Sequence, residues 1–172
     1  MPYTVVVVLH DSAPELRMLL RSLERFAPER PQVVAVDAGS RDEGMDVAAD
    51  WGAEIVALPG DPGYGAANDA GVERARHDVC VLLNPDCELL DGSLEAIVAR
   101  VRARTDALHA PRLLDADGRV QRSAHPLPGT IGALLAAPLH APLLPRSVRD
   151  RLEPYRAEAT RTVGWAIGAC LA

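Results

Sequence analysis

The first half of the chain alternates short apolar runs with stretches of mixed polarity. Apolar residues, many of them valine, make up most of 4–9, 32–36, 54–58 and 79–83. Runs of this length are typical of strands that are buried on both faces of a sheet. The pattern therefore predicts four strands, and Pro85 ends the last of them because proline cannot continue a central ladder.

The stretches between these runs have the apolar spacing of helices. The clearest includes Pro14 in its first turn, and Leu16, Leu19, Leu20 and Leu23 then fall on one face at i, i+3, i+4 and i+7. Helices are predicted from a cap at Asp11 or Ser12, over 42–51 and 66–76, and from a cap at Ser93. Repeated strand and helix units imply a mainly parallel sheet with right-handed crossovers, so the fold class is α/β.

The second half of the chain lacks this alternation. Residues 107–114 and 119–121 flank Asp115-Ala116-Asp117-Gly118, whose Asp-Gly pair suits the tight turn of a hairpin. The two aspartates also imitate a metal-binding Asp-x-Asp motif, but their place in a turn favours the hairpin. Residues 130–144 are apolar and interrupted by prolines, which predicts a helix and loop over the core, with a membrane-facing patch as the alternative. Another buried strand is predicted within 162–171.

Length and composition narrow the class of protein. A chain of 172 residues is one domain by its length. An odd count of three cysteines, with Cys80 inside an apolar run, argues against a disulfide framework and for a reducing compartment. Residues 1–9 hold neither a signal core nor a membrane span, so a cytoplasmic location is expected. The net charge of −6 argues against a nucleic-acid binder, which needs a basic face.

Polar groups follow each of the four predicted strands. They lie in His10-Asp11-Ser12, in 37–42, in 61–69 and in Asn84-Pro85-Asp86. In a parallel sheet these segments gather along the edge where ligands bind. A carboxylate there, Asp86, suits a hard divalent cation that also bridges to phosphates. A strand-end cap is the alternative for Asp86, and an Asx turn is the alternative for Asp37.

Five segments together carry a resemblance to a known family. They are Val36-Asp37-x-Gly39-Ser40-x-Asp42, Gly63-Tyr64-Gly65-Ala66-Ala67-Asn68-Asp69, Leu83-Asn84-Pro85-Asp86, Pro111-Arg112-Leu113-Leu114 through Gly118-Arg119, and Gly164-Trp165-x-x-Gly168-Ala169-Cys170. In this order, over nearly the whole chain, they resemble the family 2 glycosyltransferases of the GT-A fold. The Asn-Pro-Asp form of the third segment is similar to the rhamnosyltransferase-like branch.

The resemblance implies a fold and an activity. The fold would be a single GT-A-like domain over 1–172, a Rossmann-like, mainly parallel sheet flanked by helices and apparently truncated at its C-terminus. Residues 1–104 would form the nucleotide-sugar-binding units and 105–172 an incomplete acceptor side. The activity would be inverting, metal-assisted sugar transfer from dTDP-rhamnose or a UDP-sugar to a glycan or lipid-linked acceptor, in cell-envelope polysaccharide assembly.

The resemblance also assigns site residues. Those implied to bind the donor are His10, Asp11, Ser12, Asp37, Gly39, Ser40, Gly63, Tyr64, Asn68, Asn84 and Asp86. Asp86 would ligate Mg²⁺ or Mn²⁺, and Asn84 stands where many members have a first aspartate. Trp165, Gly168 and Ala169 would lie on the acceptor side. A bound cation would neutralise the charge that builds on the leaving diphosphate.

The family's catalytic base lies in an acidic segment that would follow Ala172, so no catalytic residue is assigned. The chain is then either a piece of a transferase or a non-catalytic nucleotide-sugar-binding remnant. The expected partners are the donor and the acceptor, with no nucleic acid. Peripheral contact with the inner face of the plasma membrane and oligomerisation through an uncovered last strand are further expectations.

Two other nucleotide-binding classes fit less well. A Rossmann oxidoreductase is poorly supported, because Gly63-Tyr64-Gly65 follows the third predicted strand and Asn68 occupies the place of the third glycine. A nucleotidyltransferase should carry a glycine-rich loop after the first strand, and 10–14 has no glycine. His125, which precedes a proline, is expected in a loop, with contact to an acceptor or a phosphate as the alternative. Trp51 and Trp165 are expected in the core.

Overall fold

The computed structural model describes residues 2–127 and 153–172. These form two compact units, one of Met1–Pro111 with Gly168–Ala172 and the other of Arg112–Ile167. The prediction for 130–144 lies outside the described residues. Within them, no helix is long and apolar enough to cross a membrane.

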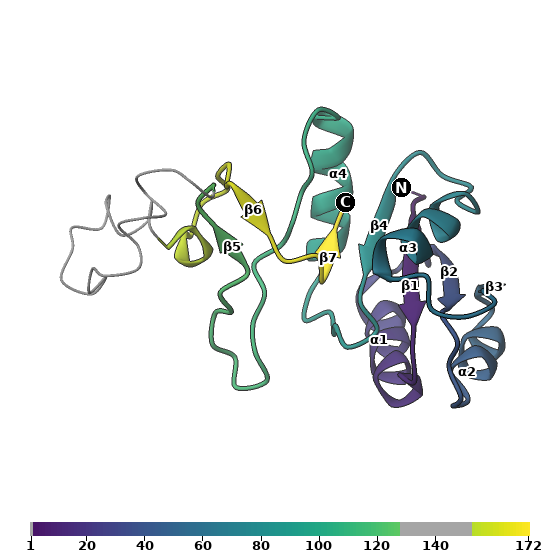
Figure 1. The fold of residues 1–172 in the computed structure, drawn as a ribbon. Helices are drawn as coiled ribbons and strands as arrows, with labels where there is room; N and C mark the ends of the chain where they lie inside the picture. The colour runs from purple at the N-terminus through teal and green to yellow at the C-terminus, as the bar shows by residue number, and fades with distance from the viewer. Residues whose placement is uncertain (1, 128–152) are drawn as a thin grey trace. The chain divides into compact units, whose positions relative to one another are not determined.

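The first unit is built on a sheet of the order β3-β2-β1-β4-β7 (Figure 1). Its strands are β1 (Thr4–Leu9), β2 (Gln32–Asp37), β3 (Glu54–Ala57), β4 (Cys80–Leu83) and β7 (Cys170–Leu171). The first four pair in parallel, and β7 joins β4 antiparallel. The mainly parallel α/β sheet predicted from the alternating runs is confirmed, and each of the four parallel strands begins and ends within one residue of its predicted bounds.

Helices cover both faces of this sheet, which explains why its strands are apolar at successive positions. The helices are α1 (Ala13–Phe26), α2 (Gly44–Trp51), α3 (Tyr64–Val72) and α4 (Ser93–Ala103). Val6, Val34 and Val36 form one buried cluster with Ala67 of α3. Side chains alternate between the two faces along a strand, so Leu9 of β1 lies on the other face, close to the first residue of α2.

The strand order reverses beside β1. The chain proceeds from β1 to β2 and β3 on one side, and then returns to place β4 on the other side of β1. The loops that leave β1 and β4 therefore diverge at a topological switch point. In open α/β sheets ligands bind in the crevice outside the carboxyl ends of the strands at such a point.

α1 begins as predicted, with Ser12 as its N-cap residue, whereas α4 begins one residue before the predicted start, and neither helix has the predicted side-chain cap. The Ser12 side chain does not cap α1, because Asp42 Oδ2 accepts the Ala13 N–H instead at 2.7 Å. Ser93 is the first residue of α4 and not its cap, and Asp91 Oδ1 accepts the Ser93 N–H at 2.9 Å. In α1 the acceptor comes from a distant loop, so no local pattern could indicate it.

The single strand predicted within 162–171 is wrong. This segment divides into β6 (Trp165–Ala166) and β7, which belong to different sheets. The reason is a change of backbone partner: Ile167 N–H donates to Ser123 O at 2.8 Å, whereas Ala169 O accepts from Asn84 N–H at 2.9 Å.

The outer edge of β7 is also covered, contrary to the expectation of an uncovered last strand. Ala172 N–H donates to His109 O at 2.9 Å, and His109 N–H donates to Ala172 O at 2.7 Å. This exchange uses the backbone groups that alternate away from β4. Residues near the end of α4 therefore continue the hydrogen bonding past β7.

The second unit holds the predicted turn. Its described elements are β5 (Ala124–His125), paired antiparallel with β6, and the short 3₁₀ helix η2 (Pro154–Arg156). Leu114 and Val120 form an antiparallel bridge around the turn, and Asp115 Oδ1 accepts the N–H groups of Asp117 and Arg119 at 3.0 and 2.8 Å. The hairpin interpretation of this acidic segment is confirmed, since its first carboxylate closes the turn.

The core position predicted for Trp165 is wrong. Its side chain is 45% exposed, and its ring stacks on His125 with centroids 4.2 Å apart. His125 lies in β5 and not in a loop, and its Nε2 is 2.9 Å from Arg122 O. Trp51, at the end of α2, is half-buried.

Candidate functional site

A pocket of about 310 Å³ lies at the switch point between β1 and β4. Its lining residues come from the loops after these two strands and from the first turn of α1: Asp11, Ser12, Glu15, Asn84, Pro85 and Asp86. Four of these were predicted from the sequence. Glu15 was not predicted, and Pro85 was given only a strand-ending role; Asp11 lies outside α1 with a positive φ, so no helical spacing related it to Glu15.

Hydrogen bonds with the loop after β2 hold the loop after β1. Arg41 N–H donates to Asp11 Oδ1 at 2.6 Å, and Asp11 N–H donates to Ser40 Oγ at 3.2 Å. His10 Nδ1 is 3.0 Å from Ala38 O. The hydrogen bond from the Arg41 N–H is the main reason why the pKa of the exposed Asp11 carboxyl is lowered. Asp11 also has a φ of 49°, a conformation that non-glycine residues adopt mainly where the surroundings hold them.

Asp37 ends β2 beneath this loop and is only 4% exposed. Its Oδ2 accepts the Gly39 N–H at 3.2 Å, and its Oδ1 accepts the Ser40 N–H at 3.3 Å. Gly39 has a φ of 82°, and a Cβ added to it would lie 3.5 Å from the Cα of Gly60. The structure therefore contains the Asx turn considered for Asp37, and it brings the loop after β2 against the loop after β3.

The third polar segment leads into α3. Asp61 Oδ1 accepts the Gly63 N–H at 2.8 Å, and Gly63 has a φ of 88°. This turn starts α3 at Tyr64, so the predicted span of 66–76 is wrong at both ends. Asn68 Nδ2 donates to Tyr64 O at 2.8 Å. Its Oδ1 is buried and accepts no hydrogen bond from the described residues.

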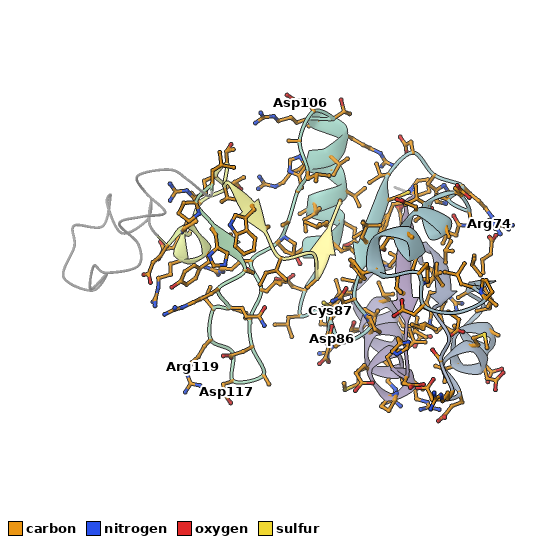
Figure 2. All side chains as sticks on the ribbon, in the orientation of Figure 1. Arg74, Asp86, Cys87, Asp106, Asp117 and Arg119 are labelled. Carbon is orange, nitrogen blue, oxygen red and sulfur yellow. The ribbon has the colours of Figure 1, made fainter. Side chains whose placement is uncertain are left out.

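Tyr64 links this segment to the start of β7. Its hydroxyl donates to Gly168 O at 2.8 Å, and burial raises the pKa of the phenol. The next carbonyl, Ala169 O, accepts from Asn84 N–H at 2.9 Å and from Cys87 Sγ at 3.4 Å. Three motifs far apart in the sequence thus meet in one hydrogen-bonded cluster, and Figure 2 shows Asp86 and Cys87 side by side just past β4.

Replacing Tyr64 with phenylalanine should loosen this cluster. The Gly168 carbonyl loses its donor, at a cost of about 0.5–1.5 kcal/mol. We expect faster hydrogen exchange of the Asn84 amide, measured by NMR, because its acceptor is the next carbonyl along the chain. Tyr155→Phe is the matched control, since it removes a hydroxyl that donates to Glu153 Oε1 in the other unit. Equal Asn84 exchange in both variants would contradict the link.

The cysteines near the site are neutral thiols. Burial raises the pKa of Cys87 to about 11 and that of Cys170 to about 12, and Asp86 also contributes to the value for Cys87. Both therefore remain protonated near neutral pH, and a protonated thiol is neither a strong nucleophile nor a good metal ligand. The chemistry of the pocket rests on oxygen groups.

Two oxygen groups of the pocket suit a divalent cation. Asp86 is exposed there, and Asn84 Oδ1 is buried without a hydrogen-bond partner in the described part of the chain. Mg²⁺ and Mn²⁺ prefer carboxylate, carbonyl and phosphate oxygens. No group of three or more acidic, histidine or cysteine side chains among residues 2–127 and 153–172 could hold a metal ion. The oxygen groups of Asp86 and Asn84 therefore fit a cation that takes its other ligands from a bound phosphate and water.

The structure brings most of the predicted donor residues to one edge. The loops with His10, Asp37 and Asn84 follow three adjacent parallel strands, and Gly63 to Asn68 follow β3 at the same edge. Gly168 and Ala169 belong to the same unit through Tyr64 and Asn84. Trp165 belongs to the second unit.

Comparison with protein families agrees with this arrangement. Residues 4–159 match the model described as glycosyl transferase family 2. The chain belongs to this family. A search of curated protein sequences found no match.

Solved structures with the same fold include glycosyltransferases. Residues 1–349 of S. aureus TarS align with 18% identity and a TM-score of 0.60, covering 74% of this chain and 42% of that one. A structure of TarS in complex with UDP-GlcNAc aligns with 18% identity and a TM-score of 0.59, and the alignment covers 69% of this chain and 36% of that one. The mannosyltransferase PcManGT from Pyrobaculum calidifontis, solved with GDP-Man and Mn²⁺, aligns with 19% identity and a TM-score of 0.56. The alignment covers 61% of this chain and 33% of that one. The chain spans less than half the length of these structures.

Proposed function

We propose that this chain is the donor-binding part of an inverting glycosyltransferase that transfers a sugar from a nucleoside diphosphate. The single observation that carries the proposal is the pocket at the β1–β4 switch point, in a member of glycosyl transferase family 2. The structures with UDP-GlcNAc and with GDP-Man have the same fold and support a nucleotide-sugar donor. The Asn-Pro-Asp segment favours the rhamnosyltransferase-like branch and thus dTDP-rhamnose or a UDP-sugar.

Each loop of the site has a proposed task. The loop from His10 to Ser12 and the turn at Asp37 hold the base and ribose, with the Asx turn keeping Gly39 and Ser40 in place. Gly63, Tyr64 and Asn68 shape the adjacent wall. Asp86, assisted by Asn84 Oδ1, holds Mg²⁺ or Mn²⁺ against the diphosphate. When bound, the cation supplies a Lewis acid that neutralises the leaving phosphates.

The acceptor side of the proposal rests on the resemblance. Trp165, Gly168 and Ala169 contribute to it, the acceptor is a glycan or a lipid-linked glycan, and the reaction belongs to cell-envelope polysaccharide assembly in the cytoplasm or at the inner face of the plasma membrane.

Calorimetric titration of UDP, GDP and dTDP, each with Mn²⁺ and with chelator, tests the proposal. We expect saturable binding of at least one nucleotide that is tighter with Mn²⁺. The affinity ranking identifies the base of the donor. Absence of binding by all three nucleotides, with the protein shown to be folded by circular dichroism, would overturn the donor-binding function.

A further inference from the structure

A second pocket, of about 410 Å³, lies at the opposite end of the strands from the first pocket. Gln32 begins β2 and Glu54 begins β3, so this pocket is at the amino-terminal ends of strands whose carboxyl ends face the donor site. Its lining includes Arg30, Gln32, Trp51, Glu54, Arg76 and His77.

The side chains around this pocket are held in place by one another. The Arg30 guanidinium lies 4.2 Å from the centre of the Trp51 ring and donates to the Trp51 carbonyl. Gln32 Nε2 donates to Glu54 Oε2 at 3.2 Å, and Gln32 Oε1 accepts the Arg76 N–H at 2.8 Å. Such mutual fixing lowers the entropy that a ligand loses on binding.

Arg30 itself has an unusual backbone. Its φ of 29° lies in the left-handed region, which arginine rarely adopts. Backbone strain of this kind persists only where the surroundings impose it, and it occurs preferentially at binding sites. The conformation is compatible with the placement of the guanidinium over the indole.

The balance of charge around the pocket is positive. Two guanidinium groups face one carboxylate, Glu54, in a chain whose net charge is −6. Arg76 Nη2 pairs with Glu54 Oε2 at 2.7 Å, and each guanidinium uses one of its five N–H groups in the bonds of the described residues. Trp51 Nε1 is buried and donates to no acceptor in the described ranges. The two guanidinium groups therefore offer several N–H donors to one oxygen-rich anion.

We propose that this pocket binds a phosphoryl group, as a phosphate monoester or the phosphate of a lipid headgroup. The arginine fork matches phosphate oxygens in a way that a point charge does not. The two guanidinium groups outnumber the one carboxylate, Glu54, and this surplus of positive charge also favours an anion. The site is separate from the donor pocket, because it lies at the other end of the strands.

Trp51 provides a direct signal for a test. The chain has two tryptophans, so the Trp165→Phe background leaves Trp51 as the only one. We expect inorganic phosphate to change its fluorescence with saturation, and Arg30→Gln with Arg76→Gln to weaken the apparent affinity about tenfold or more. Arg25→Gln is the matched control, because Arg25 also stacks on an aromatic ring, Phe26, but does not line the pocket.

The single variant Arg76→Gln separates a loss of binding from a folding defect. The Arg76 side chain is 70% exposed, so its loss should leave thermal unfolding nearly unchanged. Glycerol 3-phosphate and vesicles of phosphatidic acid in phosphatidylcholine then separate the two sources of the phosphoryl group. Binding of either supports the site. No saturable signal with any of the three probes, or equal weakening by Arg25→Gln and Arg76→Gln, overturns it.

Discussion

Asp86→Ala should abolish the effect of Mn²⁺ on nucleoside diphosphate binding. Asp86 is the exposed carboxylate of the loop that leaves β4, and the side-chain oxygen proposed to assist it, Asn84 Oδ1, is neutral. A neutral amide oxygen cannot replace the negative charge that a hard cation requires. Loss of groups that merely support metal ligands costs about 10–100-fold in metal affinity, so loss of the ligand itself should cost at least that much.

The measurement is the ratio of nucleotide dissociation constants with and without Mn²⁺, in the wild type and in Asp86→Ala. Asp106→Ala is the matched control: its carboxylate is exposed, pairs with Arg104 at 3.0 Å, and lies near the other end of α4 (Figure 2). We expect the ratio to approach one only for Asp86→Ala. A ratio unchanged by Asp86→Ala would remove Asp86 from the metal site while leaving nucleotide binding itself intact.

The regular part of this fold was accessible from the sequence because its pattern is local. Strands buried on both faces need apolar residues at every position, and the valine-rich 4–9 and the run at 32–36 show this directly. Parallel pairing then follows from the helices between them, and it places His10, Asp37 and Asn84 at one edge. The position of the site at the carboxyl ends of these strands is thus a consequence of the sheet topology.

The contacts that complete the site are not local. Asp42 caps a helix that begins 29 residues earlier, and the Tyr64 hydroxyl finds Gly168 across 104 residues. β7 has two residues, too few to show any period, and it pairs with β4 in the antiparallel direction. These features depend on which surfaces the folded chain brings together, and no periodicity encodes that choice.

Trp165 illustrates a different limit. Hydrophobicity predicts burial, but an aromatic ring can also lie half-exposed when a second ring covers one face, as His125 does here. The expectation failed because a residue type reports how apolar a side chain is, and not how much of it the neighbouring strands cover.

Gly71→Ala should destabilise the first unit strongly, although it adds one methyl group to a helix. Gly71 lies in α3 where the helix crosses β1 and β2. A Cβ at this position would overlap Val6 Cγ1 and lie 2.9 Å from Val36 Cγ2. Both valines are fully buried, so neither has room to move. Overpacking of this kind costs about 1–3 kcal/mol or more.

Gly65→Ala is the matched control in the same helix, since a Cβ there meets no atom within 4 Å. It should be neutral or stabilise by up to about 1 kcal/mol through helix propensity. Urea unfolding followed by circular dichroism measures both, and a lower midpoint with an unchanged slope assigns the loss to stability. The test is whether Gly71→Ala lowers the free energy of unfolding while Gly65→Ala does not. If Gly71→Ala unfolds at the wild-type midpoint, α3 does not pack tightly against Val6 and Val36.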